Sequence, residues 1–157
     1  MKEAEERHRL MVEQPTILLI EDEPRLRYNL QILLQKEGYA VMATPDGAEG
    51  IKQLEAQAFD MVITDLVMPG TDGFQVLDYL KVHRPGTVVV VVTGYIAPES
   101  ASEALCRGAH EYITKPFDYQ LLKTTVERAL ENARRQRPPS HGERGREENG
   151  RADREAD

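Results

Sequence analysis

Short apolar runs alternate five times along this sequence with segments that have the hydrophobic spacing of helices. The runs are Thr16–Ile20, Tyr39–Ala43, Met61–Thr64, Thr87–Val92 and His110–Thr114. A continuous apolar run is typical of a strand that is covered on both faces, as strands of a parallel sheet are. The alternation of strands and helices therefore predicts an α/β domain, with helices on both faces of a parallel sheet and right-handed crossovers.

Each apolar run is followed by a helix signal. Pro24 suits the first turn of a helix, and leucines recur after it at helical spacing until Gly38 ends the segment. Four later helices are expected to start at or near Asp46-Gly47, Asp72-Gly73, Pro98 and Asp118. We therefore expect a doubly wound (βα)5 unit, which is flavodoxin-like, with strand order 2-1-3-4-5.

The pattern divides the chain into three parts. Residues 15–133 form the expected domain, residues 1–14 form a charged N-terminal extension, and residues 134–157 are expected to form a disordered tail because apolar residues almost disappear there. The domain holds 17 acidic and 10 basic side chains, so it accounts for the whole net charge of −7. This acidic balance argues against DNA contact and leaves room for a divalent cation.

Cellular location is expected to be cytoplasmic. The longest uninterrupted aliphatic run, Val88–Val92, is far too short for a membrane span, and no charged-then-apolar leader opens the chain. The single cysteine, Cys106, cannot form an internal disulfide, which fits a reducing compartment. We therefore expect a protein without a membrane association.

Polar residues follow four of the five expected strands. Glu21-Asp22 follow the first, Asp65 the third, Thr93 the fourth and Lys115 the fifth. In the order 2-1-3-4-5 the first and third strands are neighbours about 4.8 Å apart, so the three carboxylates converge at the carboxyl edge of the sheet. Clustered carboxylates repel one another unless a cation joins them, and hard oxygen ligands suit Mg²⁺.

This arrangement predicts phosphoryl transfer to Asp65. A carboxylate that attacks phosphorus needs neutralising charge, which a metal ion and Lys115 can provide, and the Thr93 hydroxyl can bond the new phosphoryl oxygens. Each residue also has an ordinary interpretation: Thr93 as a turn residue, Lys115 as a solvated charge, and the acidic residues as helix caps. Coincidence at all four strand ends is the less plausible explanation.

The sequence resembles the receiver domains of two-component response regulators over residues 15 to about 133. The resemblance is carried by four motifs, Ile20-Glu21-Asp22-Glu23, Thr64-Asp65-Leu66-Val67-Met68-Pro69-Gly70 through Asp72-Gly73, Val92-Thr93-Gly94 and Tyr112-Ile113-Thr114-Lys115-Pro116-Phe117. Glu21 stands where many relatives have Asp, and Thr71 where many have Met. The resemblance also implies a cis peptide bond between Lys115 and Pro116, the only type of linkage in which cis costs little.

The resemblance implies a role for each residue of the site. Asp65 would be the phosphoacceptor, and Asp22 and Asp65 would bind Mg²⁺ directly. Glu21 would act on the metal through water, and the backbone carbonyl of Val67 would complete the protein ligands. Lys115 would contact the phosphoryl group, Thr93 would be the switching hydroxyl, and Tyr112 would be the aromatic switch residue.

The function implied is that of a signalling module rather than an enzyme. A histidine kinase or histidine phosphotransfer protein would donate the phosphoryl group. Phosphorylation would shift a two-state equilibrium that an unknown protein partner reads at the face formed by the fourth helix, the fifth strand and the fifth helix. The same face is a plausible homodimer interface. Few residues follow this helix, so the chain as given is expected to be a stand-alone receiver or to end in a linker cut from a longer regulator.

Two other functions were weighed. A phosphohydrolase that forms an aspartyl-phosphate generally needs an acid–base carboxylate two residues after its nucleophile, and Val67 occupies that position. A degenerate receiver that acts as a phosphorylation-independent binding scaffold would lack part of the site, whereas this chain has Glu21, Asp22, Asp65, Thr93 and Lys115 together. The phosphoacceptor function is therefore the preferred hypothesis.

Overall fold

A single five-stranded parallel sheet forms the centre of the protein. The computed structural model describes residues 14–68, 70–94 and 98–136. The sheet has the order β2-β1-β3-β4-β5, and every neighbouring pair is parallel. Its strands are β1 (Thr16–Ile20), β2 (Ala40–Thr44), β3 (Met61–Thr64), β4 (Val88–Thr93) and β5 (Glu111–Thr114). The fold and strand order predicted from the alternation are confirmed.

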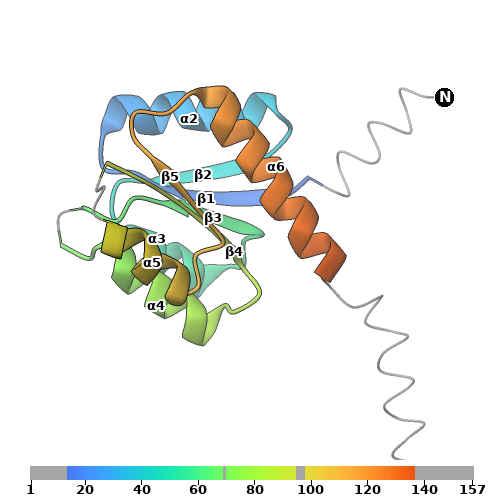
Figure 1. The fold of residues 1–157 in the computed structure, drawn as a ribbon. Helices are drawn as coiled ribbons and strands as arrows, with labels where there is room; N and C mark the ends of the chain where they lie inside the picture. Colours follow the sequence, from blue (N-terminus) through green and yellow to red (C-terminus); the bar gives the residue numbers. More distant parts are fainter. Residues whose placement is uncertain (1–13, 69, 95–97, 137–157) are drawn as a thin grey trace, which may run out of the picture.

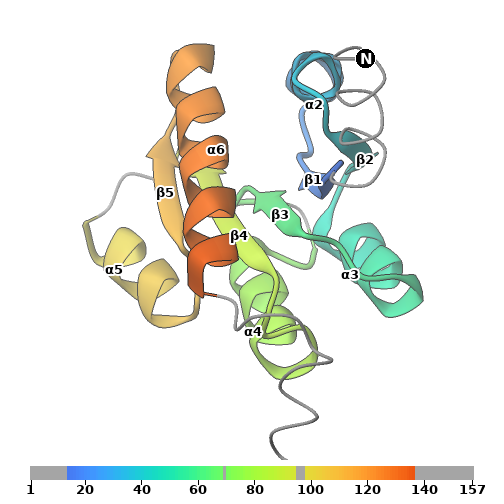
Figure 2. The same ribbon diagram turned by 90° about the vertical axis from the view of Figure 1, so that its right-hand side faces the viewer.

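Helices cover the sheet on both faces (Figures 1 and 2). α2 (Pro24–Lys36) and α6 (Tyr119–Gln136) lie on one face, and α3 (Gly47–Ala56), α4 (Gly73–His83) and α5 (Pro98–Cys106) lie on the other. Each strand contributes alternate side chains to the two layers: Ile17 and Leu19 of β1 join the core beneath α2 and α6, whereas Leu18 and Ile20 join the core beneath α3, α4 and α5. This double coverage explains why the strands are continuously apolar.

Side-chain caps set the starts of two helices. Asp46 accepts a hydrogen bond from the Glu49 amide at 2.9 Å, which fixes the start of α3. Asp72 and Gln75 form a reciprocal capping box at the start of α4. Both starts were predicted from Asp-Gly pairs.

α6 is the last element of the described structure. It continues to Gln136, into the first residues of the segment predicted as the tail. Basic residues in its last turn favour the negative end of the helix dipole, and Arg135 pairs with Glu131 at 3.4 Å one turn earlier. The rest of the predicted tail, and residues 1–13 of the predicted extension, lie outside the described residues. Within the described ranges, no helix is both long and apolar enough to cross a membrane.

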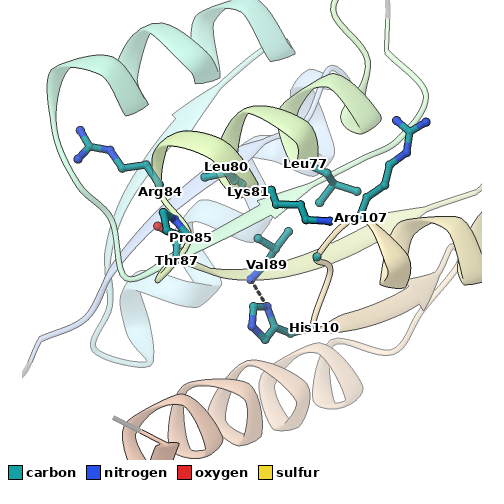
Figure 3. Close-up of a pocket in the computed structure, with 10 residues that line it drawn as sticks. Leu77, Leu80, Lys81, Arg84, Pro85, Thr87, Val89, Arg107 and His110 are labelled. Atoms are coloured by element: carbon teal, nitrogen blue, oxygen red, sulfur yellow. Dashed lines mark hydrogen bonds between the residues drawn. The ribbon is translucent and has the colours of Figure 1, made fainter. Parts of the chain in front are cut away.

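The amino-terminal edge of the sheet, opposite the strand ends that carry the polar residues, has an unusual pairing between β4 and β5. β5 begins at Glu111, one residue later than expected, and the backbone amide of His110 donates to Val89 O at 2.8 Å. In return the Val89 amide donates to Nδ1 of the His110 imidazole at 3.0 Å, so a side chain replaces the next backbone partner. Figure 3 shows this contact beside a cavity of about 80 Å³ between α4 and the start of β5.

Candidate functional site

Sheet register brings the polar strand ends to one edge. Ile20 pairs with Thr64, so Glu21 and Asp65, the next residues, lie side by side beyond β1 and β3. The Asp65 amide donates to Ile20 O at 3.3 Å, which ties the two strand ends together. Thr93 pairs with Thr114, and the Lys115 amide donates to Thr93 O at 2.9 Å. The predicted convergence of these segments is therefore observed in the backbone.

Lys115 bridges two of the carboxylates. Its Nζ lies 2.8 Å from Oδ2 of Asp65 and 2.5 Å from Oε1 of Glu21. The side chain starts at the residue that follows β5, and β4 lies between that strand and β3 in the sheet. The Lys115–Pro116 peptide bond lies in the connection between β5 and α6 and is cis, as expected.

Three carboxylates form a candidate metal centre. Glu21, Asp22 and Asp65 each offer an oxygen, and these oxygens all lie within 4.8 Å of one another. Glu21 and Asp65 are buried, whereas Asp22 faces solvent. An all-oxygen donor set with one exposed member fits Mg²⁺, which binds through a few carboxylates and keeps part of its water shell. The donor chemistry therefore suits the cation that the sequence predicted.

Burial and charge have opposing effects on the groups of this cluster. Burial raises the pKa of Glu21, and the hydrogen bond and charge of Lys115 offset only part of this effect. Burial lowers the pKa of Lys115, but its hydrogen bonds to Asp65 and Glu21 outweigh that effect, so its pKa lies above the ordinary value. Lys115 therefore remains a cation at neutral pH and partly neutralises the cluster.

The segment after β3 holds Asp65 in place. The Val67 amide donates to Oδ1 of Asp65 at 3.1 Å. Gly73, at the start of α4, packs so close that a Cβ added there would lie 2.1 Å from Asp65 O, and its amide donates to Leu66 O at 3.0 Å. α4 therefore supports the backbone of the candidate phosphoacceptor directly.

The remaining predicted site residues lie around this centre. Thr93 is fully buried at the end of β4. Tyr112 lies on β5 and packs, partly buried, against the core under α3, α4 and α5. Val67 exposes 59% of its surface at the loop after Asp65. All seven predicted residues therefore belong to the carboxyl edge of the sheet or to the strands that form it.

Sequence reasoning missed Arg27. This residue lies on α2, and its Nη1 donates to the backbone carbonyl of Glu21 at 2.8 Å and to that of Asp22 at 3.4 Å. A basic residue five positions after Asp22 was the available signal. Backbone carbonyls carry no sequence signature, so the contact itself was not predictable.

The model of the response regulator receiver domain family matches residues 17–127. The chain belongs to this family. It is thus the receiver domain of a two-component signalling protein and not a conventional enzyme.

Known proteins agree with this assignment. The receiver domain is 32% identical over 130 residues, or 83% of its length, to the transcriptional activator protein PfeR of Pseudomonas aeruginosa, of which it covers 42%. It spans less than half the length of the curated relatives that it matches first. A CheY-like receiver domain protein from Methanospirillum hungatei superposes with a TM-score of 0.76 at 27% identity, over 79% of this chain and 99% of that one.

One solved relative holds the ligands that the site chemistry suggests. The response regulator TrrA of Thermotoga maritima, determined in complex with Mg²⁺ and BeF, has a TM-score of 0.67 and 30% identity to the receiver domain. The comparison covers 74% of this chain and 99% of TrrA. The receiver domain thus has an acidic cluster able to hold a metal ion and a relative solved with one.

Proposed function

We propose that Asp65 is the phosphoacceptor of a two-component phosphorelay. The observation that carries this proposal is the contact between Lys115 Nζ and Asp65 Oδ2, 2.8 Å, inside a cluster of three carboxylates. A carboxylate held by a cation and lying beside further oxygen ligands is equipped to receive a phosphoryl group, because such transfer depends on positioning and charge neutralisation.

In the proposed reaction an oxygen of Asp65 attacks the phosphorus of a phosphohistidine on the donor protein. A phosphorus–oxygen bond forms to Asp65, and the phosphorus–nitrogen bond to the histidine breaks. Lys115 neutralises charge on the transferred oxygens. Asp22, Asp65 and the Val67 carbonyl would hold Mg²⁺ directly and Glu21 through water, and the bound metal would supply further charge neutralisation.

The donor is proposed to be a histidine kinase or histidine phosphotransfer protein in the cytoplasm. An apolar groove of about 510 Å³ lies beside Lys115, between α2 and the start of α6, and is lined by residues that include Leu26, Leu33 and Phe117. This groove supplies an apolar contact surface next to Asp65. Leu26→Ser should slow transfer from a cognate protein donor while leaving labelling by a small phosphodonor unchanged.

Output is proposed to pass through α5, β5 and α6. Tyr112 of β5 lies between the two helices in the chain order, and Thr93 lies on the neighbouring strand. Movement of the Thr93 hydroxyl toward a phosphoryl group would allow the Tyr112 ring to change position. Leu105 of α5 and Leu121 of α6, each 50% exposed, offer apolar contacts for a partner protein or a second copy of the chain.

Intact-mass measurement tests the phosphoacceptor. After incubation with acetyl phosphate and Mg²⁺, the wild-type protein should gain the mass of one phosphoryl group, and chelation of the metal should prevent the gain. Asp65→Asn should show no gain, whereas Asp78→Asn, an exposed aspartate on α4 that pairs with Arg107, should behave as the wild type. Absence of labelling in the wild type would favour the phosphorylation-independent scaffold instead.

A further inference from the structure

Two of the three carboxylates lie in a turn that has little support of its own. Glu21 and Asp22 occupy the segment between the end of β1 at Ile20 and the start of α2 at Pro24. The N-cap residue of α2, Glu23, makes no side-chain capping bond. Proline at the first helical position also has no backbone N–H to donate. This helix start therefore lacks the side-chain bonds that fix the starts of α3 and α4.

Support comes from both sides of the turn. On the sheet side, the Glu21 amide donates to Thr44 O at 3.1 Å. On the helix side, Arg27 reaches back from the first turn of α2 and donates from Nη1 to the carbonyls of Glu21 and Asp22. Within the turn, the Glu23 amide donates to Oε2 of Glu21 at 3.3 Å. Arg27 is thus the side chain that ties both acidic residues to α2.

The contact of Arg27 with the turn opposes the electrostatic repulsion among the three carboxylates. Like charges within 5 Å repel, and Lys115 contacts Glu21 and Asp65 but is not paired with Asp22. Asp22 is exposed, so solvent leaves room for its carboxylate to move. Rotation of the Asp22 backbone would carry this carboxylate away from those of Glu21 and Asp65. The guanidinium of Arg27 holds the Asp22 carbonyl, which limits that rotation, and its charge offsets part of the repulsion.

We propose that Arg27 is a positioning residue for the metal centre: it orients Glu21 and Asp22 so that their carboxylates converge with Asp65 on a divalent cation. This inference rests on the proposed function, since it gives the cluster a metal to bind. Arg27 contacts neither the acceptor carboxylate nor the transferred group. Its effect is expected in metal affinity and not in the phosphoryl transfer step itself, as is usual for residues that orient metal ligands.

Calorimetric titration with Mg²⁺ and Mn²⁺ tests this proposal directly. Arg27→Met keeps the length of the side chain and removes its donors and charge, and we expect it to weaken binding of both metals about tenfold. Arg27→Lys should recover part of this loss because it keeps the charge and one donor group. Arg25→Met, which removes an exposed arginine from the same turn of α2, should bind as the wild type. Equal affinity of the wild type and Arg27→Met would overturn the proposal.

Labelling kinetics separate positioning from a general structural role. With acetyl phosphate, Arg27→Met should require about ten times more Mg²⁺ for half-maximal rate, and its rate at saturating Mg²⁺ should match that of the wild type. A lower rate at saturation with an unchanged Mg²⁺ requirement would show that Arg27 acts on the transfer step or on the fold, against the proposal. A wild-type protein that binds no metal would instead refute the proposed function on which the inference rests.

Discussion

Lys115 Nζ lies 2.8 Å from Asp65 Oδ2, although β4 separates the two strands, β5 and β3, that these residues follow. The same nitrogen contacts Glu21, so one flexible side chain partly neutralises two buried carboxylates. A cation placed among Glu21, Asp22 and Asp65 competes with this nitrogen for the same oxygens. We therefore expect metal binding and the position of Lys115 to depend on each other.

Replacement of Lys115 by methionine should make the protein more dependent on Mg²⁺ for stability. In the presence of a chelator, the variant leaves Glu21 and Asp65 without their cation, and we expect the free energy of unfolding to fall by about 1–3 kcal/mol. Mg²⁺ should restore more stability to the variant than it adds to the wild type, because it no longer competes with Nζ. Urea unfolding with and without Mg²⁺ measures both effects.

Lys123→Met provides the control for that experiment, since Lys123 pairs with Glu37 at 3.5 Å and not with a carboxylate of the cluster. It should show the Mg²⁺ response of the wild type. A smaller response to Mg²⁺ in Lys115→Met than in the wild type would contradict the competition between the ammonium group and the metal.

Addition of one methyl group at Gly73 should disturb the backbone of Asp65. Gly73→Ala places a Cβ 2.1 Å from Asp65 O, so α4 or the segment after β3 has to move. We expect a loss of about 1–3 kcal/mol in the free energy of unfolding, typical of overpacking, and slower labelling by acetyl phosphate. Gly86→Ala is the matched control, because nothing lies within 4 Å of its added Cβ. Equal stability of the two variants would count against this packing.

Truncation of His110 should weaken the pairing of β4 with β5. His110→Ala removes the acceptor of the Val89 amide, and we expect the free energy of unfolding to fall by about 1 kcal/mol. Hydrogen exchange at the Val89 amide should accelerate. Lys81→Ala, at the rim of the same cavity, should change neither quantity, because the exposed Lys81 side chain accepts no backbone bond. Unchanged exchange at Val89 in His110→Ala would refute the role assigned to the imidazole.

Alkaline stability should depend on Tyr39. Burial raises the pKa of Tyr39 to about 12 from an ordinary value of 10.0, and the charges of Glu127 and Glu37 add to this effect. A raised pKa means that the fold favours the neutral phenol, so the contribution is complete below pH 10 and is lost as the pH rises through 12. Partial exposure of Tyr39 to solvent limits the contribution to about 1 kcal/mol.

Urea unfolding at pH 9 and at about pH 11.5 measures this contribution. Tyr39→Phe should lose less stability between the two values than the wild type. Tyr28→Phe, which changes a tyrosine that is 63% exposed, should lose as much as the wild type. An identical loss in Tyr39→Phe and the wild type would show that another group dominates the alkaline transition.

The architecture was predictable because the strand signals and the helix signals of the sequence both indicate an α/β fold. Valine and isoleucine runs indicate strands that are buried on both faces, and Asp-Gly or proline starts indicate the helices between them. Parallel strands place all their carboxyl ends at one edge, so the sequence predicts that Glu21, Asp65 and Lys115 meet there. The observed register bears out this expectation.

Contacts that use the backbone were not predictable. Arg27 binds two carbonyl groups and His110 binds an amide, and neither partner depends on the identity of its residue. The late start of β5 has a similar origin, because the His110 side chain takes the place of a backbone partner of Val89. Local sequence patterns identify helices and strands well, but they locate the ends of these elements poorly.

The spread of the site along the chain has a consequence for its synthesis. Glu21, Asp65 and Lys115 leave the ribosome in that order, and the cation that holds the first two is encoded 50 residues after Asp65. A nascent chain that has formed β1 and β3 already presents clustered carboxylates but not the ammonium group that balances them. The carboxylate cluster therefore gains its ammonium group only when the fifth strand joins the edge of the sheet. A chain interrupted before that strand would carry the proposed phosphoacceptor without Lys115.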